Sequence, residues 1–480
     1  MKFTSSLLSE EEQERIHAES LRILSDVGVK FHGQRALPLL EQNGAKVDPD
    51  TRVAKIPPEI VLQAIETTPS SVVLGARNPI HDYALPADES HYCIDGTASF
   101  VLDFGSGEKR YGTRKDIEES LRVFQRMDMG VMAWSPTVAS DAPAHSRALH
   151  EFVGIMKSTS KHGQHEVHGP RQVPYLVEIL TALWGSEAEV RRRKAYSLIY
   201  CPVAPLVHDG EMLDAYLELG AWGLPVMIMP MPVNGTTGPA SLFSNLALAN
   251  AEALSSVVVY QLAHPGRPLI YSSATGSVDF RTGAYLAGTP EMGIQSAALV
   301  TMGRYYGLPS TSAGCSSDAK EPGAEAVLDK LMTTVAPVCA GSDIIVGTGV
   351  IEGDQLLILE QLVVDNEIGH MCRRLKDGVD SDEARDLFND IAQVGPGGHF
   401  LNSRNTRLAA RSREFYMSDL LDRHPYDAWV KLGKPSMYAN ARERVKEILA
   451  DPPVDALPES VTSRLDEILR AADQELAPST

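Results

Sequence analysis

Short apolar runs and longer amphipathic runs alternate along most of this chain, beginning near Tyr92. Several of the short runs are apolar at consecutive positions, which is typical of parallel strands covered by helices on both faces. The longer runs repeat their apolar residues at helical spacing. The strands that this pattern predicts are 92–96, 131–139, 161–169, 196–204, 225–233, 268–276, 309–315 and 343–350.

Glycine and proline mark the joints between these runs. At 223–225, 266–268 and 307–309 a glycine ends a predicted helix and a proline opens the next predicted strand. About eight strand–helix units in series are the signature of a closed (β/α)₈ TIM barrel, the fold that we predict within the α/β class. A doubly wound open sheet is the alternative.

The chain on either side of the predicted barrel has a different pattern. Ser9 and the acids after it predict a helix start, and an apolar stripe follows from Ile16 to Val27. Pro-rich residues 451–460 lead to a last amphipathic helix. The predicted domains are a helical N-terminal extension (1–90), the barrel (91–376) and C-terminal helical additions packed on the barrel (377–480).

The balance of charge narrows the choice of partners. The chain has 63 acidic and 44 basic residues, a formal net charge of −19. Such a field repels nucleic acid and anionic membranes, so neither is expected as a partner. It mildly favours cationic ligands, although a solvated acidic surface alone gives the same balance.

Cysteine usage and the first residues indicate where the protein works. The five cysteines are scattered and form no CxxC pair, which favours reduced thiols over a disulfide framework. The N-terminus turns acidic before any apolar run develops, so no secretory signal is expected. No stretch approaches the roughly 18 uninterrupted apolar residues that a membrane helix needs. We therefore expect a cytoplasmic protein.

In a barrel of this kind the active site lies at the C-terminal ends of the strands. The residues predicted there are rich in aromatic rings and thioethers, include a few carboxylates and contain few lysines or arginines. Such a mixture suits a compact organic cation, although the same side chains can simply fill the top layer of the barrel. The strand-end residues are Asp95, Trp134, His165, Tyr200, Cys201, Met229, Met231, Asn234, Tyr271, Cys315, Ser316 and Glu352.

Other chemistries find little support. His162, His165 and His168 lie on a predicted extended segment, where positions three apart point to opposite faces, so no metal site is expected. The segment 347–353 misses the dinucleotide-binding spacing by one residue. Cys315 is either a nucleophile or, more simply, a small buried residue.

Several longer segments of the chain resemble one known family. These segments are 75–83, 97–116, 277–326, 359–368 and 394–407. Through them the chain is similar to the trimethylamine methyltransferase family along most of its length. That resemblance implies a (β/α)₈ barrel that presents a methylated amine to the Co(I) corrinoid (cobalamin) of a separate carrier protein.

One departure from the family bears on the substrate. The family's archaeal trimethylamine enzymes use a pyrrolysine in the barrel mouth, whereas this chain has only standard residues. The resemblance then implies a quaternary amine, with glycine betaine as the first candidate. A quaternary ammonium already carries the positive charge that makes its methyl group electrophilic, so the protein's part is positioning and desolvation. The nucleophile belongs to the corrinoid, and no catalytic residue is expected.

Within this hypothesis, Trp134, Tyr200 and Tyr271 form a cage around the cation, and Asp95 and Glu352 supply the counter-charge. A substrate carboxylate is held by charge-assisted hydrogen bonds. The candidates for that role are His165, Arg281 and His399, and Cys315 completes the predicted substrate-binding set.

Three alternatives stay open at this stage. A barrel aldolase or phosphate-dependent lyase needs a Schiff-base lysine or a phosphate site, and Lys161 and Lys320 are poorly placed for either. A catalytically silent betaine-binding barrel and an enzyme for trimethylamine are the others. The apolar segment 246–263 covers the barrel or forms a subunit interface, and we expect a homo-oligomer.

Overall fold

Eight parallel strands form the centre of the computed structural model, which describes residues 7–194, 196–412 and 414–478. Hydrogen bonds join them in the order β14-β13-β11-β10-β9-β6-β18-β17. All eight predicted strands are confirmed. Their bounds are β6 (His91–Ile94), β9 (Gly130–Ala133), β10 (His162–His165), β11 (Tyr196–Tyr200), β13 (Val226–Ile228), β14 (Leu269–Tyr271), β17 (Ser312–Ala313) and β18 (Ile344–Thr348).

The two edge strands of this order also meet, which closes the barrel. The Tyr271 amide donates to the Pro309 carbonyl over 2.9 Å, and the Thr311 amide donates to the Tyr271 carbonyl over 2.8 Å. Tyr271 and Ser310 form a parallel bridge. An open doubly wound sheet would leave these edges unpaired, so the (β/α)₈ prediction is confirmed and the alternative is wrong.

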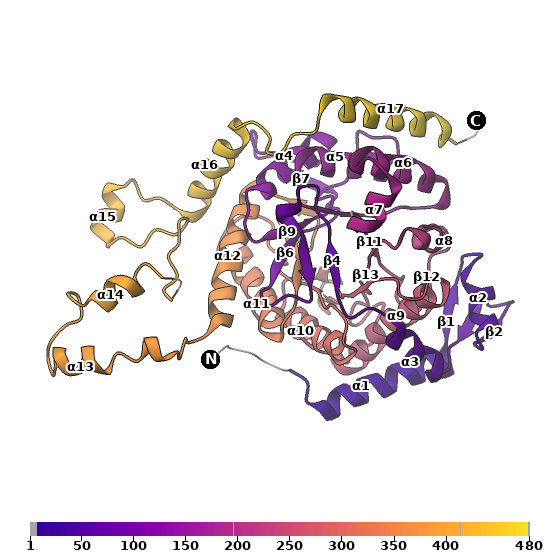
Figure 1. Cartoon of the computed structure of the whole chain (residues 1–480), viewed down its shortest axis with the longest axis horizontal. Coiled ribbons are helices and arrows are strands. Elements are labelled where there is room, and N and C mark those ends of the chain that lie inside the picture. Colours follow the sequence, from indigo (N-terminus) through magenta and orange to yellow (C-terminus); the bar gives the residue numbers. More distant parts are fainter. Residues whose placement is uncertain (1–6, 195, 413, 479–480) are drawn as a thin grey trace.

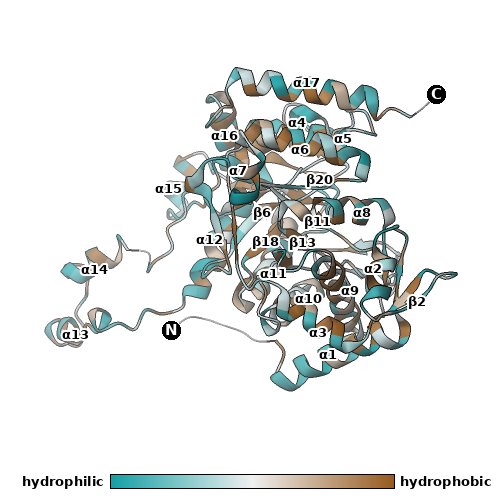
Figure 2. Ribbon diagram, turned by 45° about the vertical axis from the view of Figure 1, so that its right-hand side comes forward, coloured by the Kyte–Doolittle hydropathy of each residue, from teal (hydrophilic) through white to brown (hydrophobic). Residues whose placement is uncertain are grey.

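Helices surround the ring of strands (Figure 1). The helix α9 is long and apolar enough to cross a membrane, but 83% of its most apolar window is buried inside the molecule, as in the core helix of a barrel. In Figure 2 the hydrophobic residues gather on the strands and α9, and hydrophilic residues mark the outer face of α1. The surrounding helices are α4 (Arg114–Gln125), α5 (Arg147–Ser158), α6 (Val173–Trp184), α7 (Glu187–Arg193), α8 (Gly210–Glu218), α9 (Leu242–Ala263), α10 (Pro290–Tyr305), α11 (Ala324–Ala340) and α12 (Leu359–Asp377).

The first ninety residues are mixed rather than helical, which corrects the expected helical extension. A four-stranded sheet of order β12-β1-β3-β2 lies beside α1 (Glu10–Arg22), α2 (Ala36–Gln42) and α3 (Pro58–Thr67). Its strands are too short to show alternation in the sequence, and β12 comes from the barrel region. The strands are β1 (Val29–Phe31), β2 (Lys46–Asp48), β3 (Val53–Lys55) and β12 (Val207–His208), with a separate hairpin of β4 (Val72–Leu74) and β5 (Tyr83–Leu85).

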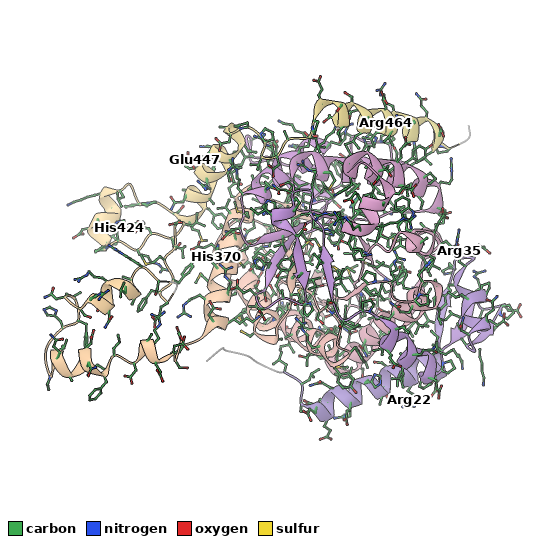
Figure 3. The ribbon with its side chains drawn as sticks, viewed as in Figure 1. Arg22, Arg35, His370, His424, Glu447 and Arg464 are labelled. Atoms are coloured by element: carbon green, nitrogen blue, oxygen red, sulfur yellow. The ribbon has the colours of Figure 1, made fainter. Side chains whose placement is uncertain are left out.

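The C-terminal residues pack on the barrel only in part. The helix α16 (Met437–Ala450) lies against α12 and α4, and α17 (Glu459–Glu475) lies against α5 and α6. Arg464 on α17, labelled in Figure 3, pairs with Glu178 of α6. Between α12 and α16, residues 378–436 extend away from the barrel as an arm (Figure 1). The arm carries α13 (Phe388–Val394), α14 (Arg404–Ala409) and α15 (Tyr426–Lys431).

Two insertions lie beyond the carboxyl ends of the barrel strands. A small sheet has the order β19-β20-β7-β8, and β15 pairs with β16 as an antiparallel hairpin. Their bounds are β7 (Phe100–Leu102), β8 (Lys109–Tyr111), β15 (Ser277–Val278), β16 (Tyr285–Leu286), β19 (Val350–Ile351) and β20 (Leu356–Leu357).

Candidate active site

Strand register decides which side chains face the barrel interior. The His162 ring and the Ser197 hydroxyl lie 2.9 Å apart, and that hydroxyl donates to Gln164 over 3.1 Å. His162 pairs in register with Met132, and Met132 pairs with Cys93. Because side chains alternate along a strand and paired positions point the same way, the next inward positions at the exit are Asp95 and Trp134.

Two buried carboxyl groups share this mouth. Asp95 is only 8% exposed, and its Oδ2 has no hydrogen-bond partner among the described residues. Asp354, from the β19–β20 turn, likewise has an unpartnered Oδ1 in the described part of the chain. Burial and the nearby charge of Asp354 raise the pKa of Asp95 well above its usual value. Burial also raises the pKa of Asp354, to about 6.

The indole of Trp134 lies flat against the backbone of Gly96. A Cβ placed on Gly96 would stand 2.1 Å from the ring, so only glycine permits this approach. The ring is 6% exposed, and its Nε1 has no partner within the described residues. One face of the indole therefore packs on the backbone next to Asp95.

The β15–β16 hairpin brings Tyr285 to the same mouth. A Cβ on Gly276, at the exit of β14, would stand 2.3 Å from the Tyr285 ring. Asp318 fixes the base of the hairpin by accepting from the Ala287 amide over 2.8 Å and the Gly288 amide over 2.9 Å. Desolvation of the hydroxyl and then the charges of Asp354 and Asp95 raise the pKa of Tyr285, because the three groups lie close together.

Two of the predicted cage residues point out of the barrel. The Tyr200 hydroxyl lies 2.8 Å from His208 Nδ1, and its ring packs edge-on against Tyr216 of α8 and Tyr260 of α9. The Tyr271 hydroxyl donates to Asn250 of α9 over 2.8 Å. Both rings therefore lie between strands and helices, and the prediction that they line the cage does not fit their placement.

His165 and Cys315 are buried away from the mouth. The Nε2 of His165 lies 3.0 Å from the Glu151 carboxylate of α5, on the outer side of the strand. Cys315 is fully buried, and burial followed by the charge of Asp365 raises the pKa of its thiol well above the usual value. A neutral buried thiol is a poor nucleophile, so Cys315 fits the role of a small buried residue in the core.

The remaining predicted residues are engaged or exposed elsewhere. Glu352 pairs with Lys109 at 2.5 Å, so its charge is already balanced. Arg281 pairs with Asp279 at 3.0 Å at the tip of the β15–β16 hairpin, with 88% of its side chain exposed. His399 is exposed on the arm. None of the three lies with Asp95 and Trp134.

The three histidines of the 162–168 segment also diverge. His162 lies 2.8 Å from the Gly75 carbonyl inside the barrel, whereas His165 faces α5 and His168 is exposed. In the described ranges, no three His, Cys, Asp or Glu side chains are grouped to hold a metal ion. A cavity of about 700 Å³ lies at the opposite end of the barrel, lined in part by Val72, Lys194 and Pro268, and is separate from the mouth.

Sequence reasoning missed Tyr285 and Asp354. Asp354 had no usable signal, since it lies in an insertion whose backbone takes a left-handed φ of 65°. Tyr285 depends on a two-residue strand that no local pattern predicts.

Comparison with known proteins matches the whole chain. A sequence model described as trimethylamine methyltransferase (MTTB) covers residues 3–477. The chain is 30% identical to trimethylamine methyltransferase MttB of Desulfitobacterium hafniense (strain DSM 10664 / DCB-2), over 97% of this chain and 94% of that protein. It is 29% identical to a glycine betaine methyltransferase of D. hafniense (strain Y51), over 98% of both chains.

A solved structure supports the fold separately. The monomethylamine methyltransferase MtmB of Methanosarcina barkeri aligns with a TM-score of 0.50 at 10% identity, covering 100% of this chain and 91% of that one. At that identity the likeness shows the barrel fold alone. The full-length sequence match goes further, and the chain belongs to the trimethylamine methyltransferase family and is a methyltransferase.

Proposed function

We propose that this enzyme takes a methyl group from a quaternary amine, with glycine betaine as the first candidate, and passes it to the Co(I) corrinoid of a partner protein. The observation that carries the proposal is the mouth itself. Two carboxyl groups, Asp95 and Asp354, each have an oxygen without a partner among the described residues and lie close to Tyr285, and the Trp134 ring packs on the backbone next to Asp95. An aromatic wall and negative charge attract a desolvated organic cation.

The residues of this chain bind and orient the substrate. The aromatic faces receive the methyl groups, and the carboxylates offset the charge of the ammonium while the site excludes water. As methyl transfer turns the ammonium into a neutral amine, the attraction to both carboxylates falls, which favours product release. The corrinoid of the partner supplies the nucleophile, so this chain needs no general base.

The choice of a quaternary amine rests on two further supports. The chain consists of standard residues throughout, so no pyrrolysine is present to activate a tertiary amine. A relative at 29% identity is named glycine betaine methyltransferase. Trimethylamine is the second candidate, because other relatives are named for that substrate.

Calorimetric titration with two molecules of the same shape tests the cation site. Glycine betaine and 3,3-dimethylbutyrate differ in that a quaternary carbon replaces the ammonium nitrogen. We expect glycine betaine to bind and the isostere, which keeps the carboxylate but lacks the ammonium charge, to bind at least tenfold more weakly, since only the ammonium is attracted to the carboxylates and the rings. Equal affinity for the two would contradict the proposal.

Other parts of the proposal concern the protein's setting. We propose a cytoplasmic homo-oligomer with a cognate corrinoid protein as partner, and the three-domain division as its organisation. The arm supports self-association because many of its large apolar side chains face solvent, and a second copy of the chain would cover them. These exposed side chains include Phe388, Ile391, Leu401, Phe415, Met417 and Tyr426.

A further inference from the structure

A fully buried ion pair lies directly below the mouth. Lys330 of α11 and Asp365 of α12 are both 0% exposed, and Lys330 Nζ stands 2.9 Å from Asp365 Oδ2. Burial alone lowers the pKa of a lysine, but Asp365 outweighs that effect, so the pKa of Lys330 is raised and its side chain stays charged. Burying such a pair is costly, and replacing it by apolar residues is often neutral for stability. Fold stability alone is therefore a weak reason for its presence.

The pair binds the backbone at the exits of two adjacent strands. Lys330 donates to the Cys315 carbonyl over 2.5 Å and to the Gly347 carbonyl over 3.3 Å. Asp365 accepts from the Gly349 amide over 2.7 Å. Cys315 and Gly349 have left-handed backbones, with φ of 53° and 93°. These contacts hold the bends by which the chain leaves β17 and β18.

Those two exits carry Asp354. Beyond the bends they bond to each other, since the Glu352 amide donates to the Ala319 carbonyl and the Gly353 amide to the Ser317 carbonyl, each over 2.9 Å. Ser316 also lies close enough to Asp354 for its side chain to lower the pKa of that carboxyl group. Any shift of either exit therefore moves the carboxyl group of Asp354.

We propose that Lys330 and Asp365 are a positioning pair that fixes the exits of β17 and β18 and thereby sets the place of Asp354 in the mouth. Their hydrogen bonds and charge act on the site without touching the substrate. The pair also links to the C-terminal part of the chain. Gln361 donates to Asp365 over 2.7 Å and accepts from Tyr438 of α16 over 2.8 Å, so the point where the arm rejoins the barrel belongs to the same network.

The chain offers a matched control in Lys161. This lysine is also buried and also donates to two backbone carbonyls, those of Phe124 and Met127, but at the opposite end of the barrel. Lys330→Met and Lys161→Met remove the same group from the two ends. The double variant Lys330→Met/Asp365→Leu leaves no stranded charge and keeps the test valid if the single variant does not fold.

Hydrogen–deuterium exchange of the full chain without substrate decides the proposal. We expect amides of 314–319 and 347–354 to exchange at least tenfold faster in the Lys330→Met and double variants, and at the wild-type rate in Lys161→Met. Wild-type exchange in the folded Lys330 variants, or equal loosening of these segments in Lys161→Met, would overturn it.

Binding of tetramethylammonium gives a second readout that a purely structural role would not move. Lys330 is a positive charge that lowers the pKa of both Asp95 and Asp354. Its loss should move the pH midpoint of binding upward by about one unit, and an unchanged midpoint would contradict the charge role. This readout rests on the proposed function. If the wild type binds no tetramethylammonium, the proposed cation site fails, while exchange still decides the positioning role.

Discussion

Asp354 is the residue of the mouth whose carboxyl group changes its charge near neutral pH. Its pKa is raised to about 6, chiefly by burial, so it is neutral well below that pH and ionised above it. The pKa of Asp95 is also raised, first by burial and then by the charge of Asp354, so ionisation of either carboxyl group opposes ionisation of the other. The strength of cation binding should follow this ionisation.

We therefore expect the affinity for glycine betaine to rise with pH. Between pH 7 and pH 5 the ionised fraction of Asp354 falls, and binding should weaken by about tenfold, the change that follows from one unit below a pKa near 6. Calorimetric titration across this range measures it. In Asp354→Asn the dependence should flatten, and a flat profile in the wild type would remove Asp354 from the cation site.

Trp134 is the second residue whose removal is informative. Trp134→Ala deletes the aromatic face beside Asp95, and we expect the dissociation constant for glycine betaine to rise by roughly ten- to thirtyfold, since a desolvated cation–π contact contributes about 2 kcal/mol. Trp134→Phe keeps a ring and should lose less. If the alanine variant binds as the wild type does, the indole is not part of the site.

The alternation of inward and outward side chains along a strand explains which site residues the sequence could predict. Asp95 and Trp134 stand at strand ends and on the inward side, so position alone found them. Tyr200 and Tyr271 also stand at strand ends, but they are on the outward side. Where a strand is apolar at consecutive positions, the sequence does not reveal which residues face inward, and a one-residue shift reverses the answer.

At the scale of elements, the β15–β16 hairpin is the part of the site that depends on a small local anchor. Asp318 fixes it through two backbone amides, and Tyr285 is its contribution to the mouth. Most of the barrel's buried side chains lie elsewhere, in the strands and their helices. Loss of the hairpin's anchor should therefore affect binding more than stability.

Asp318→Ala should weaken glycine betaine binding by about tenfold and lower Tm by only a few degrees, because a local anchor of two hydrogen bonds is lost. Asp279→Ala is the control, since it removes an acid from the same hairpin where Asp279 pairs with the exposed Arg281. Calorimetry and thermal unfolding measure the two effects. Unchanged binding in Asp318→Ala would show that the hairpin does not shape the site.

The elements were predictable from the sequence where a strand and a long helix follow each other in a repeating unit. All eight barrel strands were found, because each is followed by a helix with clear periodicity. The strands of the first ninety residues and the pairs β15–β16 and β19–β20 were not, since each strand has only two or three residues, too few to show a pattern of alternation. Asp354 and Tyr285 lie on such elements, so much of the site depends on contacts that local sequence does not contain.

At the scale of the whole molecule, the arm is the feature whose apolar side chains stay exposed to solvent in a single copy of the chain. Residues 378–436 extend from the barrel and expose large apolar side chains, although α12 and α16 at either end are packed (Figure 1). Exposed apolar surface of this extent marks an interaction site.

Light scattering should give the purified protein a molar mass in solution that corresponds to more than one copy of the chain. Replacing Phe388, Leu401 and Met417 by serine removes three of the exposed apolar side chains of the arm and should shift the mass toward a single copy. As a control, replacing exposed Val73 by serine alters an apolar side chain on the barrel's other end. A wild-type mass of one copy would contradict self-association through the arm.

Methyl transfer itself tests the central claim most directly. Purified enzyme is mixed with chemically reduced cob(I)alamin and, separately, with glycine betaine, tetramethylammonium or trimethylamine, and the visible absorbance of Co(I) is followed. We predict that Co(I) is consumed with a quaternary amine, that dimethylglycine appears when glycine betaine is used, and that Trp134→Ala and Asp354→Asn slow the reaction. Consumption of Co(I) with trimethylamine and with no quaternary amine would contradict the account.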